Sequence, residues 1–236
     1  MGSFMSEKGN RKRWFVCLKN ILKIFIKRPK YVYLGEKFDD EPSIILSNHI
    51  GAKGPLTHEL YFPKPFRFWG TYEMNLGLKG VYKYLTEVYY TKKKHWKLFW
   101  AKLFCLIAAP LTNLFYKGLN LISTYPDFRF RKTIIESMKT IESGQSLIIF
   151  PEDSSNGYFD ELTKCFAGFA LFANAALKKG IDLKVYQTYY RKKDKIFVID
   201  NPVRFSEFVK NFNSRPALAD SVCDRINKLG TIDLPH

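Results

Sequence analysis

The stretch Ser43-Ile-Ile-Leu-Ser-Asn48-His49, followed by the turn Ile50-Gly51-Ala52-Lys53-Gly54-Pro55, decides the fold of this chain. A short apolar run bounded by turn residues is typical of a strand buried on both faces of a sheet. Leu147-Ile-Ile-Phe150-Pro151-Glu152-Asp153 repeats the pattern, because a buried strand again runs directly into polar residues. Each motif alone also fits a core histidine or a surface turn. In one parallel sheet, however, the carboxyl ends of both strands share the edge where α/β proteins bind ligands, so we predict that His49 faces Glu152.

Strand and helix patterns alternate along the rest of the chain. Strands are expected at 31–34, 43–47, 66–69, 146–150, 185–189 and 196–199, and helices at 76–91, 93–117, 131–142, 165–179, 204–212 and 216–229. This alternation predicts the α/β class, with a mostly parallel sheet flanked by helices on both faces. The length of 236 residues suits one such domain, whose core needs no disulfide or structural metal.

Residues 11–28 carry the clearest helical pattern. At 100° per residue, a narrow polar face is formed by Lys12, Lys19, Asn20, Lys23 and Lys27, and aromatic and aliphatic side chains cover the rest. Pro29 then ends the helix. A basic face opposite a broad apolar face is typical of a helix lying in the plane of a membrane. The alternative is a helix packed on the domain with its lysines in solvent. We divide the chain into this N-terminal segment, 1–30, and an α/β domain, 31–236.

The charge balance indicates an anionic partner. The chain has 38 Lys and Arg residues against 22 Asp and Glu residues, a formal charge of +16, and 17% aromatic residues. Nucleic acid, an anionic membrane and a phosphorylated substrate all fit that balance. The densest basic cluster lies on the amphipathic helix and no RNA-recognition motif is present, so we expect a membrane surface and no nucleic acid. The longest charge-free apolar stretch, 103–116, has 14 residues, whereas a membrane span needs about 20. We therefore expect a peripheral protein on the cytoplasmic face of a membrane.

Neither a resident cofactor nor a metal is expected. The four cysteines are far apart and form no C-x-x-C pair, which is typical of reduced thiols. The histidines also lack the paired spacing of zinc ligands.

The two strand-end motifs resemble those of the glycerolipid acyltransferases, the lysophosphatidate (PlsC-like) group. Asn48-His49 is similar to the start of that family's Asn-His-x4-Asp motif, and Phe150-Pro151-Glu152 to the opening of its Phe-Pro-Glu-Gly-Thr-Arg motif. Lys164-Cys-Phe-Ala-Gly168 is similar to its later Phe-Lys-x-Gly segment. The resemblance covers residues 31–205, with the motifs in the family's order.

The resemblance implies an acyltransferase. Its first-motif histidine, His49 here, would be the general base that takes a proton from an acceptor hydroxyl, which then attacks the thioester of acyl-CoA or acyl-carrier protein. The acceptor would be a lysolipid. An imidazole suits this role because its pKa lies near neutral pH. The resemblance also implies substrate contacts from Asn48, Glu152, Asp153, Ser154, Ser155, Lys164 and Gly168.

Several positions depart from the family pattern. Gly54 stands where the family has the Asp that orients the histidine, and the loss of an equivalent carboxylate in serine hydrolases costs roughly 10⁴-fold in rate. Thr124 and Ser155 stand where the family has phosphate-binding arginines, and Asp153 replaces a glycine. The candidates to replace the carboxylate are Glu59, Glu73 and Asp153; those to replace the arginines are Lys53, Arg129, Arg131 and Lys164.

These departures leave two alternatives to the acyltransferase. One is a catalytically inert homologue that binds lipid or acyl chains. The other is a nucleic-acid-binding protein that uses the basic and aromatic residues.

Overall fold

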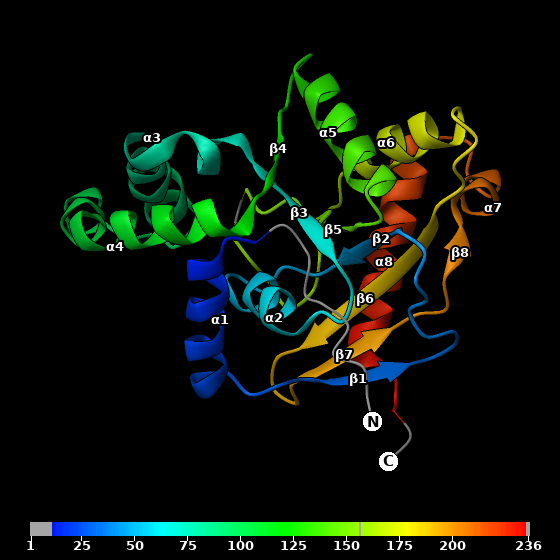
Figure 1. The fold of residues 1–236 in the computed structure, drawn as a ribbon, viewed down its shortest axis with the longest axis horizontal. Helices are drawn as coiled ribbons and strands as arrows, with labels where there is room; N and C mark the ends of the chain where they lie inside the picture. Colours follow the sequence, from blue (N-terminus) through cyan, green and yellow to red (C-terminus); the bar gives the residue numbers. More distant parts are fainter. Residues whose placement is uncertain (1–10, 156, 235–236) are drawn as a thin grey trace.

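A mixed, mostly parallel sheet forms the centre of the computed structural model, which describes residues 11–155 and 157–234 (Figure 1). Within that part of the chain, the strands follow the order β1 (Lys30–Tyr33), β7 (Ile196–Ile199), β6 (Lys184–Arg191), β2 (Ser43–Ser47), β5 (Ser146–Ile149), β3 (Phe66–Thr71) and β4 (Ile122–Thr124). The short β8 (Val203–Arg204) also pairs with β6, and β6 runs antiparallel to both β7 and β8. The predicted fold class is confirmed.

The strand β2 lies at the centre of the sheet, parallel to β5 on one side and to β6 on the other. Each of its five residues is buried. Ile45 pairs with Ile148 of β5 and with Tyr186 of β6. Such double pairing explains why the run reads as continuously apolar, since a central parallel strand has no solvent-facing side. The prediction that the two motif strands lie side by side is confirmed.

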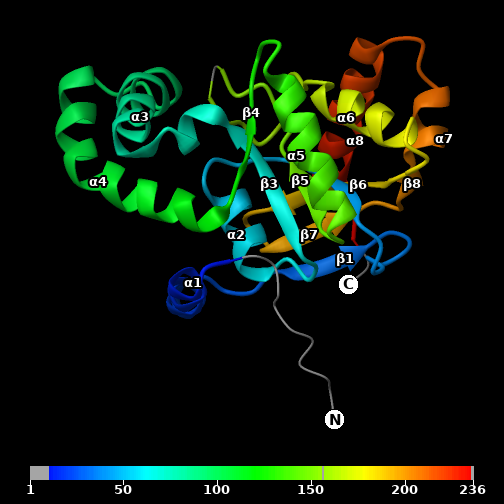
Figure 2. The same cartoon turned by 45° about the horizontal axis from the view of Figure 1, so that its top comes forward.

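Helices cover both faces of the sheet (Figures 1 and 2). One face packs against α5 (Phe130–Glu142), α6 (Gly168–Leu177), α7 (Phe205–Lys210) and α8 (Arg215–Thr231). The other packs against α1 (Arg13–Phe25), α2 (Lys53–Tyr61) and the end of α4 (Leu98–Leu119). Alternate residues of β2 serve the two cores, because Ile44 and Leu46 face the first group and Ile45 faces the second.

A helical lobe projects from the edge of the sheet (Figures 1 and 2). It contains the 3-10 turn η1 (Tyr72–Asn75), α3 (Gly77–Tyr84), the π-helical η2 (Leu85–Lys93) and α4. A small apolar cluster of its own, Val81, Tyr84, Leu85, Cys105 and Ala109, holds the lobe together. The helix predicted at 76–91 is one helical run, 77–93, that changes from an α-helix to a π-helix at Leu85, and the second part has the wider turn that often marks functional sites.

The strands that the sequence did not predict are short. The strands β4 and β8 contain three and two residues. A hydrophobic period cannot be recognised over so few positions, and such strands form because their neighbours offer unpaired backbone groups.

The orientation of α1 differs from the prediction. Phe15 is fully buried, and Lys19 and Lys23 turn toward α2, where they lie near Glu59 (3.2 Å) and over the Tyr61 ring. The large apolar side chains of its opposite side, Trp14, Ile21, Ile24 and Phe25, are exposed. The prediction that the lysines face solvent or lipid headgroups is therefore wrong for Lys19 and Lys23. Residues 1–10 of the predicted N-terminal segment lie outside the described residues.

The prediction that no segment is long enough to cross a membrane also needs correction. The helix α4 is 22 residues long and meets the length and composition of a span, although Pro110 lies inside it. Only 22% of its most apolar window is buried. The helix expected at 93–117 has the right position. The charge-free stretch 103–116, which the sequence analysis used to judge the length, is shorter than the apolar helix that the structure shows.

Candidate active site

A strained turn follows β2 and directs His49 out of the sheet. Ile50 and Gly51 both have positive φ, 44° and 61°. A left-handed conformation is unusual for a β-branched residue such as Ile50 and costs about 1–3 kcal/mol, a cost that is common at functional sites. The chain then enters α2 at Lys53. The turn explains why the last strand residues are buried while His49 reaches the surface in part.

The His49 ring packs between aromatic side chains. It stacks on Tyr158 with the ring centroids 4.5 Å apart, and meets the edge of Phe150 at 4.8 Å. Burial of the ring, and then the positive charge of Lys93, lower the pKa of His49 to about 3, and the nearby carbonyl of Gly51 opposes that shift. Although this carbonyl is close, Nδ1 makes no hydrogen bond of ordinary geometry. The ring is thus a neutral imidazole that can accept a proton, but its pKa lies well below the near-neutral value expected from the sequence, which makes it a weaker base.

Glu152 lies beside His49, as the sheet register requires. Its side chain is buried, and its carboxylate lies near the backbone N–H groups of Phe159 and His49, but Oε2 is buried without a hydrogen-bond partner. Burial raises the pKa of Glu152 despite these N–H groups and the nearby Lys93. The segment also forms a β-bridge to Cys165. Glu152 is therefore a buried carboxylate beside the backbone of the histidine turn.

Lys93, at the end of η2, is a site residue that the sequence analysis missed. Its Nζ donates to Ser154 Oγ at 2.6 Å and lies 5.0 Å from the centroid of the Tyr158 ring. Burial lowers the pKa of Lys93, whereas the charges of Glu152, Asp153 and Glu73 oppose the shift. The run Lys92-Lys93-Lys94 was the available signal, but only the structure shows which of the three points inward: Lys92 and Lys94 are exposed.

Asn48 holds β2 to β6. Its side chain is fully buried, Oδ1 accepts the N–H of Tyr190 at 2.7 Å, and Nδ2 donates to the carbonyl of Tyr190 at 3.3 Å. Both polar groups of the amide are thus occupied by backbone. Asn48 therefore holds β2, the strand that leads to His49, to β6, and the substrate contact that the family resemblance implies stays a prediction.

The other predicted binding residues lie in or after the loop that follows β5. Ser154 binds Lys93, and Asp153 accepts the backbone N–H of Ser155 at 3.1 Å. Lys164 is exposed and lies 3.9 Å from Asp153. Gly168 begins α6, where its nearest side chains are Phe130 and Trp69. The structure therefore joins Ser154 to His49 through Lys93 and Tyr158, and gives no contact between Gly168 and this group.

The candidate replacements for the missing carboxylate have other partners. Glu59 binds Arg11 at 2.8 Å and Lys19 at 3.2 Å, and Glu73 accepts a hydrogen bond from Thr71. Asp153 binds Ser155 and Lys164. In residues 11–155 and 157–234, none of these three carboxylates hydrogen-bonds the His49 ring. The prediction that Glu59 could orient the His49 ring is therefore wrong.

The candidate replacements for the missing arginines stay predictions, and the structure shows their present surroundings. Arg129 binds Asp127 at 2.7 Å and lies over the rings of Tyr72 and Tyr125. Arg131 and Lys53 are exposed side chains. Lys93 is the cation that has a direct electrostatic effect on His49.

A second histidine, His58, lies in the core below the site. It is 1% exposed, and its Nε2 is 3.1 Å from Ser47 Oγ. Burial lowers the pKa of His58 to about 3. Both His58 and its neighbour Glu59 are buried in α2.

Gly54 is required by close packing. A Cβ at this position would lie 2.4 Å from the carbonyl oxygen of His49, which is backbone and cannot move aside cheaply. The first turn of α2 therefore closes tightly over the histidine turn. The backbone leaves no room for any side chain at position 54, so the carboxylate of the family pattern could not be accommodated there.

We expect Gly54→Asp to lower both stability and activity rather than to restore a histidine partner. Overpacking of this kind costs about 1–3 kcal/mol, and it would displace the His49 backbone. Urea unfolding and kcat measure the two effects. Gly168→Ala is the matched control for stability, because its added Cβ meets Phe130 at an ordinary 3.5 Å. A stable Gly54→Asp protein with raised activity would contradict this interpretation of the turn.

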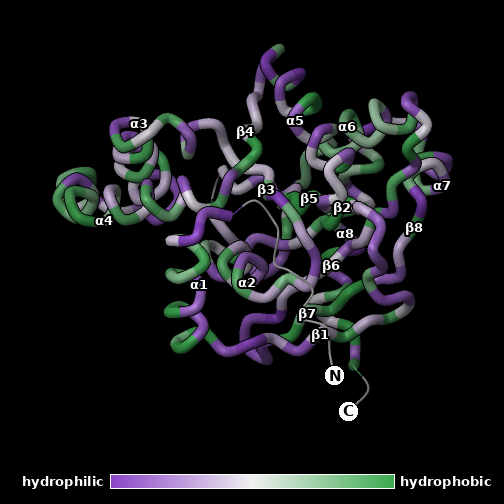
Figure 3. Tube along the Cα trace, viewed as in Figure 1, coloured by the Kyte–Doolittle hydropathy of each residue, from purple (hydrophilic) through white to green (hydrophobic). Residues whose placement is uncertain are grey.

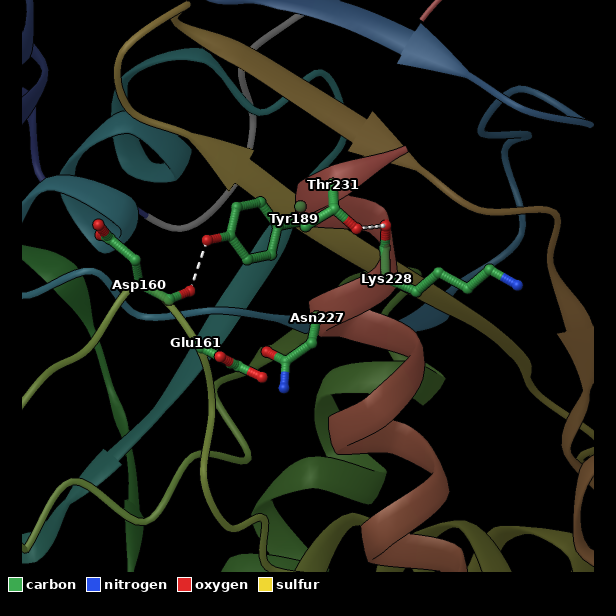
Figure 4. Close-up of a pocket in the computed structure, with 7 residues that line it drawn as sticks. Asp160, Glu161, Tyr189, Asn227, Lys228 and Thr231 are labelled. Atoms are coloured by element: carbon green, nitrogen blue, oxygen red, sulfur yellow. Dashed lines mark hydrogen bonds between the residues drawn. The ribbon is translucent and has the colours of Figure 1, made fainter. Parts of the chain in front are cut away.

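A hollow of about 480 Å³ lies away from this group, between the loop at Asp160 and the end of α8 (Figure 4). Tyr189 lines it and donates to the carbonyl of Asp160 at 2.5 Å. Tyr189 packs with the core of α6 and α8, whereas Phe150, the neighbour of His49, packs with the core of α1 and α2. The hollow is therefore on the other side of the sheet. No three His, Cys, Asp or Glu side chains gather as metal ligands in the described part of the chain.

Comparison with known proteins gives a distant likeness. No protein-family model matches this chain, and no curated protein matches it. Among solved structures, the chain is similar to the 1-acyl-sn-glycerophosphate (LPA) acyltransferase PlsC from Thermotoga maritima, with 14% sequence identity over 94% of this chain and 81% of that chain. The TM-score of 0.46 is too low for the likeness to carry an argument, so the function of this chain is inferred from its own residues.

Proposed function

We propose that this protein transfers a fatty acyl group from a thioester donor to the hydroxyl group of a lysolipid at a membrane surface. One observation carries the proposal: a neutral histidine, an ammonium group and a buried carboxylate meet at the carboxyl edge of β2 and β5. His49 supplies the base and Lys93 the positive charge. The Glu152 carboxylate lies near the His49 N–H. General-base catalysis needs a base that is neutral at the working pH and held in place.

The reaction follows from the chemistry of the ring. His49 accepts the proton of the acceptor hydroxyl while the hydroxyl oxygen attacks the thioester carbonyl. The C–S bond then breaks, and the imidazolium returns its proton to the leaving thiolate, so an ester and a thiol are formed. Desolvation favours the neutral ring at both ends of this cycle, which makes the return of the proton rapid.

Lys93 supports an anionic acceptor. Its ammonium group is partly buried, next to the His49 and Tyr158 rings, and one of its protons binds Ser154. A lysolipid phosphate beside it would form a charge-assisted hydrogen bond. We assign to Lys93 the headgroup contact that arginines make in the family pattern.

The surface of α1 supports a location at a membrane. Its side opposite α2 exposes Ile24 and Phe25, each 78% accessible, together with Ile21 and Trp14. The net charge of +16 favours an anionic leaflet such as the cytoplasmic one. The acyl donor, acyl-CoA or acyl-carrier protein, would approach from the aqueous side.

The direct test is an acyl-transfer assay with the purified full chain. Radiolabelled acyl-CoA, and separately acyl-carrier protein, are incubated with lysophosphatidate, lysophosphatidylglycerol, lysophosphatidylcholine and monoacylglycerol in mixed vesicles. We expect a labelled diacyl product with an anionic acceptor. No product with any donor and acceptor pair would overturn the enzymatic proposal.

Lys93→Met should selectively lower the activity toward an anionic acceptor. A hydrogen bond to a charged group contributes about 1.5–3 kcal/mol, so we expect kcat/KM to fall roughly 10- to 150-fold for lysophosphatidate and much less for monoacylglycerol. The control is Lys92→Met, because Lys92 is the exposed neighbour in the same run. An equal loss for charged and neutral acceptors would show that Lys93 does not hold the headgroup.

One observation favours a second candidate, an inert lipid-binding homologue. Nδ1 of His49 is buried without a hydrogen-bond partner, so no group orients the ring as a catalytic carboxylate does. This candidate predicts that lysolipid binds in equilibrium dialysis while the acyl-transfer assay yields no product.

A further inference from the structure

The largest exposed apolar surface of the described chain belongs to α4. This helix alone exposes Leu98, Phe99, Trp100, Leu103, Phe104, Leu106, Ile107, Leu111 and Leu114. Ile107 is 75% accessible, which is unusual for isoleucine in a folded domain. Much of α4 is green in the hydropathy view (Figure 3). A contiguous apolar surface of this kind indicates an interaction site.

The exposed residues form one broad face of the helix. At 100° per residue, Trp100, Phe104, Ile107, Leu111 and Leu114 fall within one sector. The opposite sector is narrow and buried, and its members are small or polar: Ala101, Cys105, Ala109 and Asn113. The helix therefore directs its small side chains toward the lobe and its large ones outward, the reverse of a helix that packs on a soluble core.

Basic and aromatic residues mark the beginning of this face. Lys92, Lys94 and Lys97 are exposed just before and at the start of α4, and Trp96 and Trp100 accompany them. Lysines next to an apolar helix are attracted to the anionic surface of a leaflet, and each lysine adds to that attraction. Tryptophan prefers the boundary between headgroups and hydrocarbon. The chemistry of the rim therefore matches an anionic bilayer.

The path of the chain argues against a membrane-spanning α4. The chain leaves β3 through η1 before it reaches α4. It comes back to β3 after α4, because β4 pairs with β3. If α4 crossed a bilayer, the packed partners α3 and η2 would cross with it. They carry Lys79, Lys83 and Glu87, all exposed. Charged groups at the bilayer centre are expensive, so a position in the plane of the membrane is favoured.

We propose that the apolar face of α4 inserts into the surface of an anionic phospholipid bilayer, with the helix lying in the membrane plane. The inference rests on the proposed membrane location but not on acyl transfer. The helix α1 lies next to the C-terminal part of α4, because Phe15 of α1 packs on Phe115 of α4 with ring centroids 5.3 Å apart. The sequence analysis assigned membrane contact to α1 alone; α4 supplies the larger apolar area.

The lobe joins this surface to the candidate active site through one layer of side chains. Tyr90 of η2 contacts Trp96 and Phe104 on the α4 side. Lys93 of the same element binds Ser154 beside His49. The element η2 therefore lies between the apolar face of α4 and Lys93, the proposed headgroup contact.

The test is flotation of the full chain with vesicles of phosphatidylcholine mixed with phosphatidylglycerol. The variant L103Q/I107Q/L111Q removes three large side chains from the apolar face, and we expect its vesicle affinity to fall about a hundredfold or more, given the apolar area withdrawn from lipid. The matched control F128Q/I135Q/L171Q changes three exposed apolar residues outside α1 and the lobe, and should bind like the unchanged protein. Circular dichroism confirms that each variant folds.

Two further readouts separate the alternatives. Brominated lipid should quench fluorescence of the unchanged protein more than that of W100F. Acyl transfer to a short-chain, water-soluble lysolipid should survive L103Q/I107Q/L111Q, so a loss of vesicle binding is distinguishable from a loss of chemistry. Unchanged binding by this variant would overturn the inference, as would a loss seen only in I21Q/I24Q/F25Q of α1. Resistance of the bound protein to alkaline carbonate extraction would overturn the in-plane position in favour of a span.

Discussion

His49→Ala is expected to lower kcat for acyl transfer by roughly 10²–10⁴-fold, the contribution of a positioned general base. The fold should survive, because the ring lies at the end of β2 and reaches the surface in part. His49→Gln, which keeps most of the volume against Tyr158 and Phe150, should be equally inactive. Equal melting temperatures with unequal kcat would separate chemistry from folding.

The other histidines provide the controls for this measurement. His95 is exposed, so His95→Gln should leave kcat unchanged. His58 is buried against Ser47, so His58→Gln should lower stability while each folded molecule keeps its kcat. If His49→Ala retains its activity, or His58→Gln alone abolishes it, His49 is not the base.

The pH profile of the same enzymes reports the protonation state of the ring. Burial and Lys93 lower the pKa of His49 from its ordinary 6.5 to about 3, and the neutral ring is the active form. Activity should therefore stay level as the pH falls from 8 to about 5, instead of declining below 6.5. Lys93→Met removes the nearby positive charge, which raises the pKa of His49 and moves the acidic limb to higher pH.

Glu59→Ala should destabilise the protein by about 3–5 kcal/mol, the usual cost of removing one partner from a buried ion pair. The Glu59 side chain is fully buried, and it binds Arg11 and Lys19, whose side chains are 8% and 13% exposed. Both cations would be left without their carboxylate. For a domain of this size the loss corresponds to a fall in Tm of roughly 10 °C.

Glu142→Gln is the matched control, because Glu142 pairs with Lys179 where both side chains are more than half exposed. An exposed pair contributes about 0–1 kcal/mol, so Tm should change little. A Glu59→Ala protein as stable as Glu142→Gln would show that the Arg11–Glu59–Lys19 cluster does not fasten α1. Thermal unfolding followed by circular dichroism measures both variants.

This cluster also bears on how α1 is attached to the domain. Phe15 fills a space against Gly118 of α4, and Glu59 belongs to α2, which begins just after the histidine turn. The same contacts that fix α1 therefore support the backbone of the candidate site. Deleting the helix would leave Glu59 buried without partners, so point variants of its exposed side are the appropriate test of membrane contact.

The sequence alone determined the centre of the fold. Continuous apolar runs at β2 and β5 indicated neighbouring central strands, since a parallel strand buried on both faces leaves no alternating pattern. Their shared carboxyl edge followed from parallel pairing, and with it the approach of His49 to Glu152. These features depend on local period and on sheet geometry, which one stretch of chain can specify.

Tertiary structure decided everything that depends on which side of an element faces inward. The helical period grouped the lysines of α1, but only the buried carboxylate of Glu59 turned Lys19 toward the domain and the apolar side outward. Three consecutive lysines are equivalent in sequence, yet the π-helical turn of η2 directs Lys93 to Ser154 and leaves Lys92 in solvent. In the sequence, Gly54 appears only as a missing carboxylate. The structure gives the reason, because a Cβ at Gly54 would lie 2.4 Å from the carbonyl oxygen of His49. A periodicity specifies that a helix has two faces, whereas the partner that covers one of them comes from a distant part of the chain.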